Sequence, residues 1–376
     1  MNEQTKAAVQ AFEKLIEEQL ERKNRIESNS EKNDFANKDK ITVGLCDGDG
    51  IGPTIMDSVR RVLNVLIDEE TSSGKIVLKD IKGLTIDRRL QTGKPIPLDT
   101  LEELKMCDVI LKGPTTTPHG GTLESANVTM RRELDLYANV RPVRIPEKNI
   151  DWTFFRENSE GEYVLGSKGL KITDGMTVDF KITTEAGTRR IARAAFDYAQ
   201  KNGKTNVAIV TKANIMKKTD GMFSEIAHEV AKEYPEITVD DWYIDIMTAN
   251  LINEDIRDKF QVFLLPNLYG DILTDEAAQI QGGVGTAGSA NIGDRYAMFE
   301  AIHGSAPRMI EQGLGKYANP SSIIKAAAMM LRHIHLFGKA QRLEEALEKC
   351  SASCVMTGDE RGKTCIEFTD ELINLL

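Results

Sequence analysis

The chain has 376 residues, a net charge of −10 and 41% hydrophobic residues. This length exceeds what a single hydrophobic core usually serves, so we expect two domains or lobes. The acidic balance argues against nucleic acid as a general partner, because neutralising many phosphates requires a basic surface. No apolar run is long enough to cross a bilayer, so we expect no membrane contact.

The cysteines bear on the cellular compartment. Their number is odd, they are widely scattered, and no signal peptide is visible, which together predict a reducing, cytoplasmic environment. Cys350 and Cys354 lie four positions apart, but no His or Cys stands nearby at zinc-ligand spacing. We interpret them as ordinary thiols rather than as a metal site.

Residues 1–40 differ from the rest of the chain. The apolar residues Val9, Phe12, Leu15, Ile16 and Leu20 fall at helical spacing, and an Asn-, Ser- and Lys-rich stretch follows. The segment is too acidic for a mitochondrial transit peptide. We therefore expect an exposed helical extension and a linker. The sequence leaves open whether the helix packs on a partner subunit or is frayed.

Strand and helix patterns alternate from Ile41 onward. Short apolar runs ending in turn residues predict buried strands, and apolar stripes at helical spacing separate them, for example over 188–200. This alternation is typical of an α/β protein with a mixed, mostly parallel sheet. The predicted buried strands are 41–45, 109–112, 206–211 and 262–265.

One segment departs from that pattern. Met176, Val178, Phe180 and Ile182 alternate with polar residues, which predicts a half-buried antiparallel strand. Together with 162–170, this strand would form a hairpin that protrudes from the α/β body. Arms of this kind often pair between subunits.

A glycine-rich stretch matches a nucleotide-binding pattern literally. Gly283-Val-Gly285-Thr-Ala-Gly288 fits G-x-G-x-x-G, but a dinucleotide fingerprint needs a strand before it and a helix after it. Here we predict a helix before it, over 275–281, and a loop after it, over 289–293. A turn that permits close backbone approach therefore explains these glycines better than a Rossmann site.

The strongest chemical feature is a cluster of arginines in an acidic protein. Arg131, Arg141 and Arg156 follow closely on one another, and Ser125 and Asn127 lie just upstream. The planar guanidinium group binds carboxylates bidentately, so the cluster is suited to a small acidic ligand. On spacing alone, an exposed basic helix face explains the arginines equally well.

A second feature is acidic. Asp271 and Asp275 are four positions apart and would share one helix face, where two carboxylates suit Mg²⁺ or Mn²⁺. Acids at a helix N-terminus are the alternative, which spacing alone favours. Asp245 lies in an apolar run and is a third candidate ligand. Tyr163 and Lys212 are candidates for proton transfer, although Lys212 also fits a surface lysine that flanks a strand.

Several long motifs lie in a recognisable order along the chain. They are Gly48-Asp-Gly-Ile-Gly52; Lys112-Gly-Pro-Thr-Thr-Thr-Pro118; Glu133-Leu-Asp-Leu-Tyr-Ala-Asn-Val-Arg-Pro142; Phe155-Arg-Glu-Asn-Ser-Glu-Gly-Glu-Tyr163; Lys212-Ala-Asn-Ile-Met216; Asn267-Leu-Tyr-Gly-Asp-Ile-Leu-Thr-Asp275; and Glu300-Ala-Ile-His-Gly-Ser-Ala-Pro307. With them the chain resembles the isocitrate/isopropylmalate dehydrogenase family of β-decarboxylating oxidoreductases, from about Ile41 to the C-terminus.

The resemblance implies a two-lobed α/β fold that is not a Rossmann fold. The large, cofactor-side lobe would comprise 41–136 and 282–376. The small lobe, with substrate, metal and dimer interface, would comprise 137–160 and 185–281, and 161–184 would form a clasp hairpin. The implied assembly is a homodimer whose active sites take residues from both subunits.

The implied reaction is oxidative decarboxylation of isocitrate to 2-oxoglutarate and CO₂ with reduction of NAD(P). Ser125 and Asn127 favour isocitrate, because both can hydrogen-bond its γ-carboxylate where isopropylmalate enzymes place bulky apolar residues. Homoisocitrate, tartrate and 3-isopropylmalate are alternative substrates within the family. A non-catalytic regulatory subunit is a further alternative, disfavoured because every polar group that the reaction needs is present.

The family's residue roles carry over to matching positions of this sequence. Arg131, Arg141 and Arg156 would hold the substrate carboxylates. Asp271 and Asp275 would hold Mg²⁺ or Mn²⁺, with Asp245 arriving from the other subunit. A base, Lys212 acting through water, would take the hydroxyl proton, and Tyr163 would protonate C3.

The cofactor preference is less sharply defined by the resemblance. After Pro307, NAD users of the family usually carry an Asp-Ile pair, whereas this chain has Arg308-Met309. Loss of the carboxylate and gain of an arginine favour NADP, with its 2′-phosphate, over NAD. The cofactor contacts that the resemblance assigns are Thr117, Asn214, His303, Gly304, Arg308 and Asn319.

Overall fold

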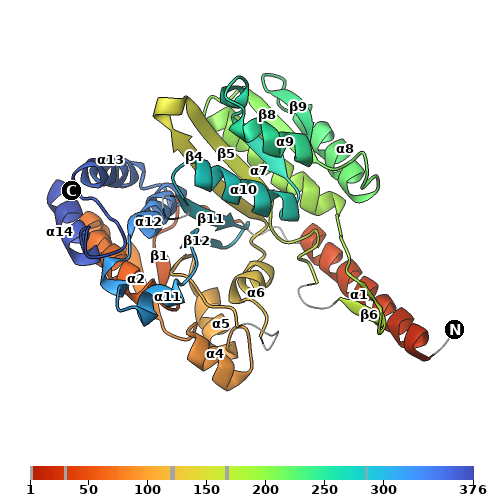
Figure 1. Cartoon of the computed structure of the whole chain (residues 1–376), viewed down its shortest axis with the longest axis horizontal. Helices are drawn as coiled ribbons and strands as arrows, with labels where there is room; N and C mark the ends of the chain where they lie inside the picture. The colour runs from red at the N-terminus through yellow and green to blue at the C-terminus, as the bar shows by residue number, and fades with distance from the viewer. Residues whose placement is uncertain (1–2, 29–31, 119–122, 166–168, 284, 286) are drawn as a thin grey trace. The chain divides into compact units, whose positions relative to one another are not determined.

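The computed structural model describes residues 3–28, 32–118, 123–165, 169–283, 285 and 287–376. The chain forms two compact units, each of which mixes helices with a mainly parallel set of strands (Figure 1). This confirms the predicted α/β class. The first unit comprises Met1–Glu31 and Tyr137–Ala277, and the second comprises Lys32–Leu136 and Ala278–Leu376.

The second unit is built on strands in the spatial order β2-β1-β3-β12-β11. Its strands are β1 (Ile41–Cys46), β2 (Ile76–Ile81), β3 (Val109–Lys112), β11 (Gly288–Ile292) and β12 (Ala297–Ala301). Its helices are α2 (Gly52–Leu66), α3 (Asp68–Ser72), α4 (Ile86–Thr92), α5 (Leu98–Lys105), α6 (Ala126–Glu133), α11 (Pro307–Glu311), α12 (Ser321–His333), α13 (Phe337–Ser353) and α14 (Cys365–Leu375), with a 3₁₀ turn η4 (Gly315–Tyr317).

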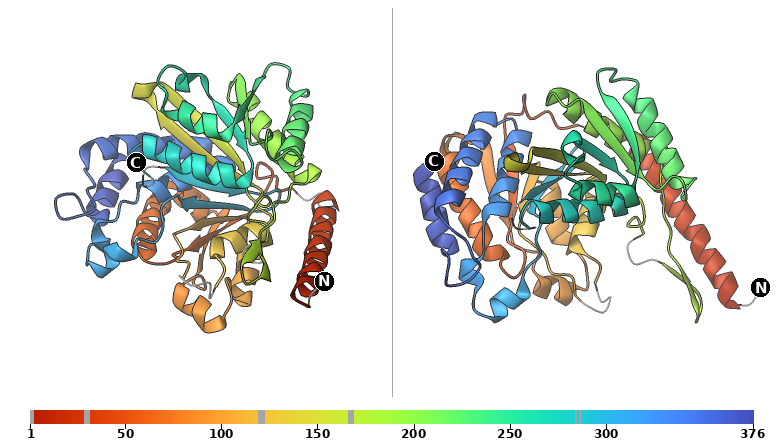
Figure 2. Two further views of the ribbon diagram at one scale, coloured as in Figure 1. Left: turned by 45° about the vertical axis from the view of Figure 1, so that its right-hand side comes forward. Right: turned by 45° about the horizontal axis from the view of Figure 1, so that its top comes forward.

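The strands of this unit pair in parallel except at one end. β1 pairs in parallel with β2 and β3, and β12 pairs in parallel with β3 but antiparallel with β11. The predictions for 41–45 and 109–112 are confirmed by β1 and β3, whose largely buried side chains explain the nearly unbroken apolar sequence. The helices α2, α12, α13 and α14 pack against one another, as Figure 2 shows in orange and blue.

The first unit has strands in the order β4-β5-β10-β8-β9 and a separate hairpin of β6 and β7. Its strands are β4 (Ala138–Ile145), β5 (Ile150–Glu157), β6 (Leu170–Thr173), β7 (Met176–Val178), β8 (Asn206–Thr211), β9 (Thr238–Tyr243) and β10 (Val262–Leu265). Its helices are α1 (Glu3–Ser28), α7 (Glu185–Lys201), α8 (Thr219–Ala231), α9 (Ile244–Ile252) and α10 (Asn267–Ile280), with 3₁₀ turns η1 (Pro146–Lys148) and η2 (Arg257–Lys259).

A buried aromatic cluster fixes the strands that carry the candidate site. β5 pairs antiparallel with β4 and parallel with β10. Phe154 of β5 stacks on Phe263 of β10, with ring centroids 4.3 Å apart, and Trp152 meets both rings edge-on. Because two neighbouring strands share this packing, the residues at their carboxyl ends are held in a fixed register. The predicted strands over 206–211 and 262–265 are confirmed as β8 and β10.

The glycine-rich stretch at 283–288 lies partly outside the described residues. The helix predicted before it is confirmed by α10, but the loop predicted over 289–293 is wrong, because β11 occupies Gly288–Ile292 and pairs with β12. The strand was not predicted because most of its residues are small and carry little strand signal. Gly288 lies against the backbone of α12, where an added Cβ would be 2.6 Å from the Ala326 nitrogen. A strand rather than a helix follows the glycines, so the pattern is not a dinucleotide fingerprint.

The N-terminal helix is confirmed as α1, and it is largely exposed as predicted, since Val9, Phe12, Ile16 and Leu20 are 40–55% exposed; Leu15 is the exception. Leu15 is buried in a cluster with Val164 and Leu165, and Phe180 and Ile182 pack against that cluster. Figures 1 and 2 show α1 beside the hairpin of β6 and β7. The helix therefore packs on its own unit through one face.

A hairpin is present, but its first strand is β6 (Leu170–Thr173) rather than 162–170, of which 162–165 form a turn. β6 and β7 pair antiparallel, but the strand expected over 176–182 covers only Met176–Val178, and Phe180 and Ile182 turn towards α1 instead. Residues 166–168, which belong to the predicted clasp, lie outside the described residues. No helix among the described residues is both long and apolar enough to span a membrane.

Candidate active site

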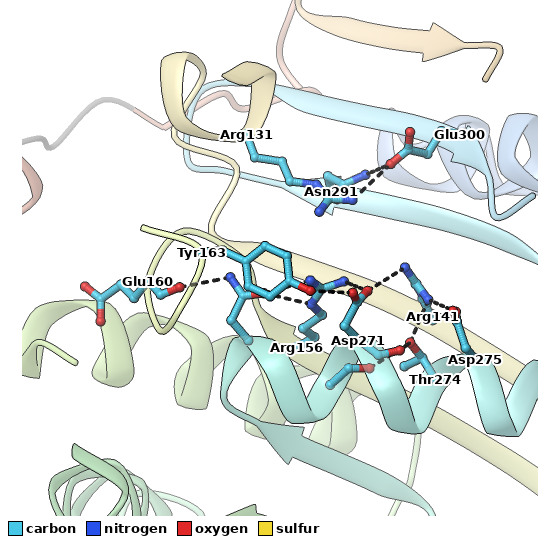
Figure 3. A network of polar contacts seen from close by, with 12 residues as sticks. Arg131, Arg141, Arg156, Glu160, Tyr163, Asp271, Thr274, Asp275, Asn291 and Glu300 are labelled. Atoms are coloured by element: carbon cyan, nitrogen blue, oxygen red, sulfur yellow. Dashed lines mark hydrogen bonds and ion pairs between the residues drawn. The ribbon is translucent and has the colours of Figure 1, made fainter. Parts of the chain in front are cut away.

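Arg156, at the carboxyl end of β5, is the most deeply buried charged residue of the candidate site in the first unit. Its side chain is 1% exposed, and its Nε and Nη2 both donate to Asn267 Oδ1, at 3.1 and 2.7 Å. Its Nη1 donates to Asp271 Oδ1. Asn267 and Asp271 both lie in the first turns of α10, which follows β10 after Pro266. Neighbouring parallel strands thus deliver an arginine and the start of a helix to the same place (Figure 3).

A second arginine lies against the same helix face. Arg141 of β4 donates from Nη1 to Thr274 Oγ1 at 2.6 Å and to Asp275 Oδ1 at 3.0 Å, and its Nη2 is 3.8 Å from Asp271. Tyr163 donates its hydroxyl to Asp271 Oδ2 at 2.8 Å. The structure therefore brings together five predicted site residues, which are Arg141, Arg156, Tyr163, Asp271 and Asp275 (Figure 3).

Burial differs between the two charge types in this network. The Arg141 side chain is 9% exposed, whereas those of Asp271 and Asp275 are 36% and 62% exposed. Buried guanidinium groups need anionic partners, and the aspartates fill that role here. The carboxylates remain open to solvent on their other side, where their oxygens are suitable donors for Mg²⁺ or Mn²⁺.

The two carboxylates make only part of a cation site. Among the described residues, no three His, Cys, Asp or Glu side chains come together in a way that could hold a metal. Asp271 and Asp275 present two hard oxygen donors on one helix face, which fits a divalent cation that takes its remaining ligands from elsewhere.

Lys212 and Asp245 form a separate cluster in the same unit. Lys212 Nζ donates to Asp245 Oδ1 at 2.7 Å, and this hydrogen bond holds the pKa of the Asp245 carboxyl below its usual value. The Lys212 backbone nitrogen donates to Asp220 Oδ2 at 2.7 Å, and the buried Asp220 pairs with Lys181 at 2.5 Å. Asn214 follows in an exposed loop.

In the second unit, Arg131 belongs to a buried polar cluster. Its Nη2 lies 3.5 Å from Glu300 Oε1, which also accepts from Asn291 at 2.8 Å, and Lys112 Nζ lies 3.2 Å from Glu300 Oε2. Burial acts to raise the pKa of Glu300, but Lys112 and Arg131 hold it below its usual value. Within the described part of the chain, Arg131 Nε is buried without a hydrogen-bond partner, as expected of a donor that serves an anionic ligand.

The residues predicted to select the substrate lie at the start of α6. Ser125 precedes the helix, and Asn127 Oδ1 accepts from Thr115 at 3.0 Å. The buried Arg89 donates to the carbonyl of Thr116 and approaches that of Glu124, and Thr117, next to Thr116, is exposed. Residues 119–122, which precede Ser125 by a few positions, lie outside the described residues.

Four of the predicted cofactor contacts, His303, Gly304, Arg308 and Asn319, lie in the segment between β12 and α12. His303 Nδ1 lies 3.0 Å from the Gly304 carbonyl, while its Nε2 is buried and has no hydrogen-bond partner among the residues described. Burial lowers the pKa of His303, so the ring is neutral at pH 7. Arg308 is exposed on α11, and Asn319 accepts from the Ser321 nitrogen at 2.9 Å. Because His303 Nδ1 faces a carbonyl and must donate to it, Nε2 of the neutral ring is an acceptor, which suits a donor group of a ligand, whereas the exposed Arg308 suits a phosphate.

Sequence reasoning missed the residues that support Arg156. Asn267 Oδ1 accepts the hydrogen bonds from Arg156 Nε and Nη2, and Asn267 Nδ2 donates to the Glu160 carbonyl at 3.0 Å. Gly270 faces the Arg156 side chain so closely that a Cβ would lie 2.5 Å from its Cγ. The one signal in the sequence was that these residues fall inside motifs already singled out.

The comparisons with known proteins agree with this architecture. The chain belongs to the isocitrate/isopropylmalate dehydrogenase family, whose model matches residues 42–375. It is 40% identical over 344 residues to the isocitrate dehydrogenase [NADP] of Rickettsia prowazekii, covering 88% of this chain and 68% of that protein. It is 37% identical over 349 residues to isocitrate dehydrogenase [NAD] subunit 2, mitochondrial, of Schizosaccharomyces pombe, covering 89% and 87%.

A solved structure supports the same conclusion. The crystal structure of isocitrate dehydrogenase from Methylococcus capsulatus superposes with a TM-score of 0.79 at 34% identity, covering 89% of this chain and 99% of that one. The predicted family and its fold are thereby confirmed.

Proposed function

We propose that this protein is an isocitrate dehydrogenase that oxidises and decarboxylates isocitrate to 2-oxoglutarate and CO₂, with NADP or NAD and a divalent cation. The observation that carries the proposal is the network of Arg141, Arg156, Tyr163, Asp271 and Asp275, in a family whose similar members are named isocitrate dehydrogenases. This network combines anion-binding, cation-binding and proton-donating groups within hydrogen-bonding distance of one another.

Anion binding is assigned to the arginines. Arg141 and Arg156 are buried, so their attraction for a carboxylate is less screened by water than that of surface arginines. Isocitrate carries several carboxylates, and Arg131 would hold another with its unpaired buried Nε. Ser125 and Asn127 would hydrogen-bond the γ-carboxylate, which gives the preference for isocitrate over 3-isopropylmalate.

Cation binding is assigned to Asp271 and Asp275, with Asp245 contributed by a partner subunit. When bound, the cation supplies Lewis-acid polarisation of the C2 hydroxyl, and the nicotinamide supplies the acceptor for the C2 hydride. If Asp271 and Asp275 held a cation, the guanidinium groups of Arg141 and Arg156, which now pair with these aspartates, would be available to substrate carboxylates.

Two side chains move the protons. Lys212, through a water molecule, takes the proton of the C2 hydroxyl as the alcohol is oxidised to a ketone. The bond from C3 to the β-carboxylate then breaks, CO₂ departs, and its bonding electrons pass to the ketone to form an enolate. Tyr163 gives its hydroxyl proton to C3, which completes 2-oxoglutarate. The hydrogen bond from Tyr163 to Asp271 orients the hydroxyl beside the candidate cation ligands.

NADP is favoured over NAD on the strength of Arg308. This exposed arginine on α11 carries a positive charge suited to a 2′-phosphate. Replacing Arg308 by Asp should raise the KM for NADP far more than the KM for NAD. Steady-state rates with each cofactor measure this, and equal changes in both constants would exclude Arg308 as the phosphate ligand.

The assembly follows the family resemblance, and the location follows the cysteines. We propose a homodimer that shares active-site residues between subunits, with the β6–β7 hairpin as its exchanged arm. The described cysteines are all free thiols, which is consistent with a cytoplasmic location.

A substrate panel tests the assignment. The purified chain alone is given isocitrate, homoisocitrate, tartrate or 3-isopropylmalate with Mg²⁺, each with NAD and with NADP, and formation of reduced nicotinamide is followed. Isocitrate should give the largest kcat/KM. A larger value for another acid would mean that Ser125 and Asn127 do not select the γ-carboxylate.

A further inference from the structure

The helix α1 lies outside the part of the chain that matches the family, which begins at residue 42. It nevertheless packs on the first unit through a few side chains. Leu15 is buried with Val164 and Leu165, directly after Tyr163 in the chain, and Phe12 stacks on Phe180 with ring centroids 4.9 Å apart. An element additional to the family fold therefore lies against the segment that carries a proposed proton donor.

The last turns of α1 bring a charge to this segment. Arg22 Nη1 donates to Glu160 Oε1 at 3.1 Å, and its Nη2 donates to Ser159 Oγ at 3.2 Å. The side chains of Arg22 and Glu160 are only 11% and 3% exposed. A charge pair so little exposed is screened weakly, and removing one partner leaves the other buried and unpaired.

The segment needs that positive charge because it buries two carboxylates. Glu157 accepts from the backbone nitrogens of Ser159 and Glu160, and Glu160 accepts from the backbone and hydroxyl of Thr184. Burial, and then the neighbouring charge of Glu160, raise the pKa of Glu157 to about 7, while Arg22 opposes that rise. Arg190 donates to Ser159 Oγ at 3.0 Å and is the second cation of the cluster.

This cluster is connected to the candidate site by hydrogen bonds. The Glu160 carbonyl accepts from Asn267 Nδ2 at 3.0 Å, and Asn267 Oδ1 accepts two hydrogen bonds from Arg156. Figure 3 shows this sequence of contacts from Glu160 to Arg156. The packing is tight at the same point, since a Cβ on Gly187 of α7 would lie 2.4 Å from Glu160 Oε1. Glu160 therefore has little freedom to settle elsewhere.

We propose that Arg22 is a positioning residue for the active site: by pairing with Glu160 it fixes the backbone of the Arg156–Tyr163 segment and, through Asn267, the guanidinium group that binds substrate. The inference rests on the proposed function, because its readout is the binding of isocitrate. It assigns to α1 a role in building the site of its own chain.

Three variants of the full-length protein test the proposal. Arg22→Ala removes the pairing charge, Arg22→Lys retains a cation that can still reach Glu160, and Arg25→Ala removes an exposed arginine from the same end of the helix. Initial rates give kcat and the KM for isocitrate and for the nicotinamide cofactor, and thermal unfolding reports stability.

The KM values distinguish a positioning role for Arg22 from a general role in stability. Loss of a charge-assisted hydrogen bond corresponds to roughly a tenfold effect or more, so Arg22→Ala should raise the isocitrate KM about tenfold. The cofactor KM should stay near that of the wild type. Arg22→Lys should restore most of the loss, and Arg25→Ala should change neither constant.

Gly187→Ala provides a second approach should Arg22→Ala fold poorly. Its methyl group would press on the Glu160 carboxylate and should give the same selective rise in the isocitrate KM. The proposal is overturned if the isocitrate KM of Arg22→Ala matches that of Arg25→Ala, if Arg22→Lys restores none of the loss, or, should Arg22→Ala fold poorly, if Gly187→Ala binds isocitrate normally. Absence of turnover in the wild type would instead refute the proposed function.

Discussion

A single methyl group on Gly270 should disable Arg156. An ideal Cβ at this position would lie 2.5 Å from Arg156 Cγ and 2.6 Å from its Cβ. Carbon atoms in contact normally lie about 3.5–4 Å apart, so one of the two groups must move by about 1 Å. Arg156 cannot yield easily, because its Cβ is fixed by β5 and its guanidinium group is held by Asn267 and Asp271.

The expected magnitudes follow from this clash. Overpacking a buried site costs about 1–3 kcal/mol, partly offset by the roughly 1 kcal/mol that alanine gains over glycine in a helix. Unfolding should therefore become easier by no more than about 2 kcal/mol. Activity should suffer more, because a misplacement of about 1 Å in a binding group lowers kcat/KM by roughly 10²-fold.

The assay compares kcat/KM for isocitrate and the melting temperature of Gly270→Ala with those of a matched control. Gly221 also lies within a helix of the first unit, but a Cβ there would meet nothing within 4 Å. Gly221→Ala should keep full activity and be equally or slightly more stable. If Gly270→Ala also retained wild-type kcat/KM, the location of Arg156 against α10 would not matter for substrate binding, and our account of the site would be wrong.

Three further predictions concern single side chains. Tyr163→Phe should lower kcat by roughly 10²-fold or more with little change in the isocitrate KM, since it loses a proton donor; an unchanged kcat would remove Tyr163 from the reaction. Asp271→Asn should raise the Mg²⁺ concentration for half-maximal rate by at least about tenfold, and a wild-type Mg²⁺ titration would contradict its role as a ligand. Folding raises the pKa of Glu157 from 4.5 to about 7, so the protonated side chain stabilises the folded protein. This stabilisation is fully present below pH 4.5 and is lost as the pH rises through about 7. Urea unfolding of Glu157→Gln should accordingly depend less on pH across this interval than that of the wild type, and identical pH dependences would refute the assignment.

The sequence predicts the strands of the fold well where burial is complete. β3, β8 and β10 have the predicted bounds because both faces of each strand are covered, so their apolar runs are nearly unbroken. β11 was predicted as a loop because Gly288–Ile292 consists mostly of small residues, which suit close packing on α12 but carry little strand signal. This segment is a strand because of its pairing with β12 and its packing on α12, which lie elsewhere in the chain.

The candidate site was predicted in its charged residues but not in their supports. The arginine and aspartate motifs state which groups are present, and the structure adds that Arg141 and Arg156 pair with Asp271 and Asp275. The contact from Asn267 to Glu160 joins residues far apart in the chain, so no local pattern indicates it. The apolar stripe of α1 likewise predicted a helix without identifying what the helix packs against.

The central claim is that this chain alone oxidises and decarboxylates isocitrate. The most direct test incubates the purified protein with isocitrate and Mg²⁺, in parallel with NADP and NAD, and measures 2-oxoglutarate and reduced nicotinamide together. We predict that the two products form in equal amounts, faster with NADP, and that a chelator abolishes both. Folded protein that forms neither product with Mg²⁺ or Mn²⁺ would contradict the claim.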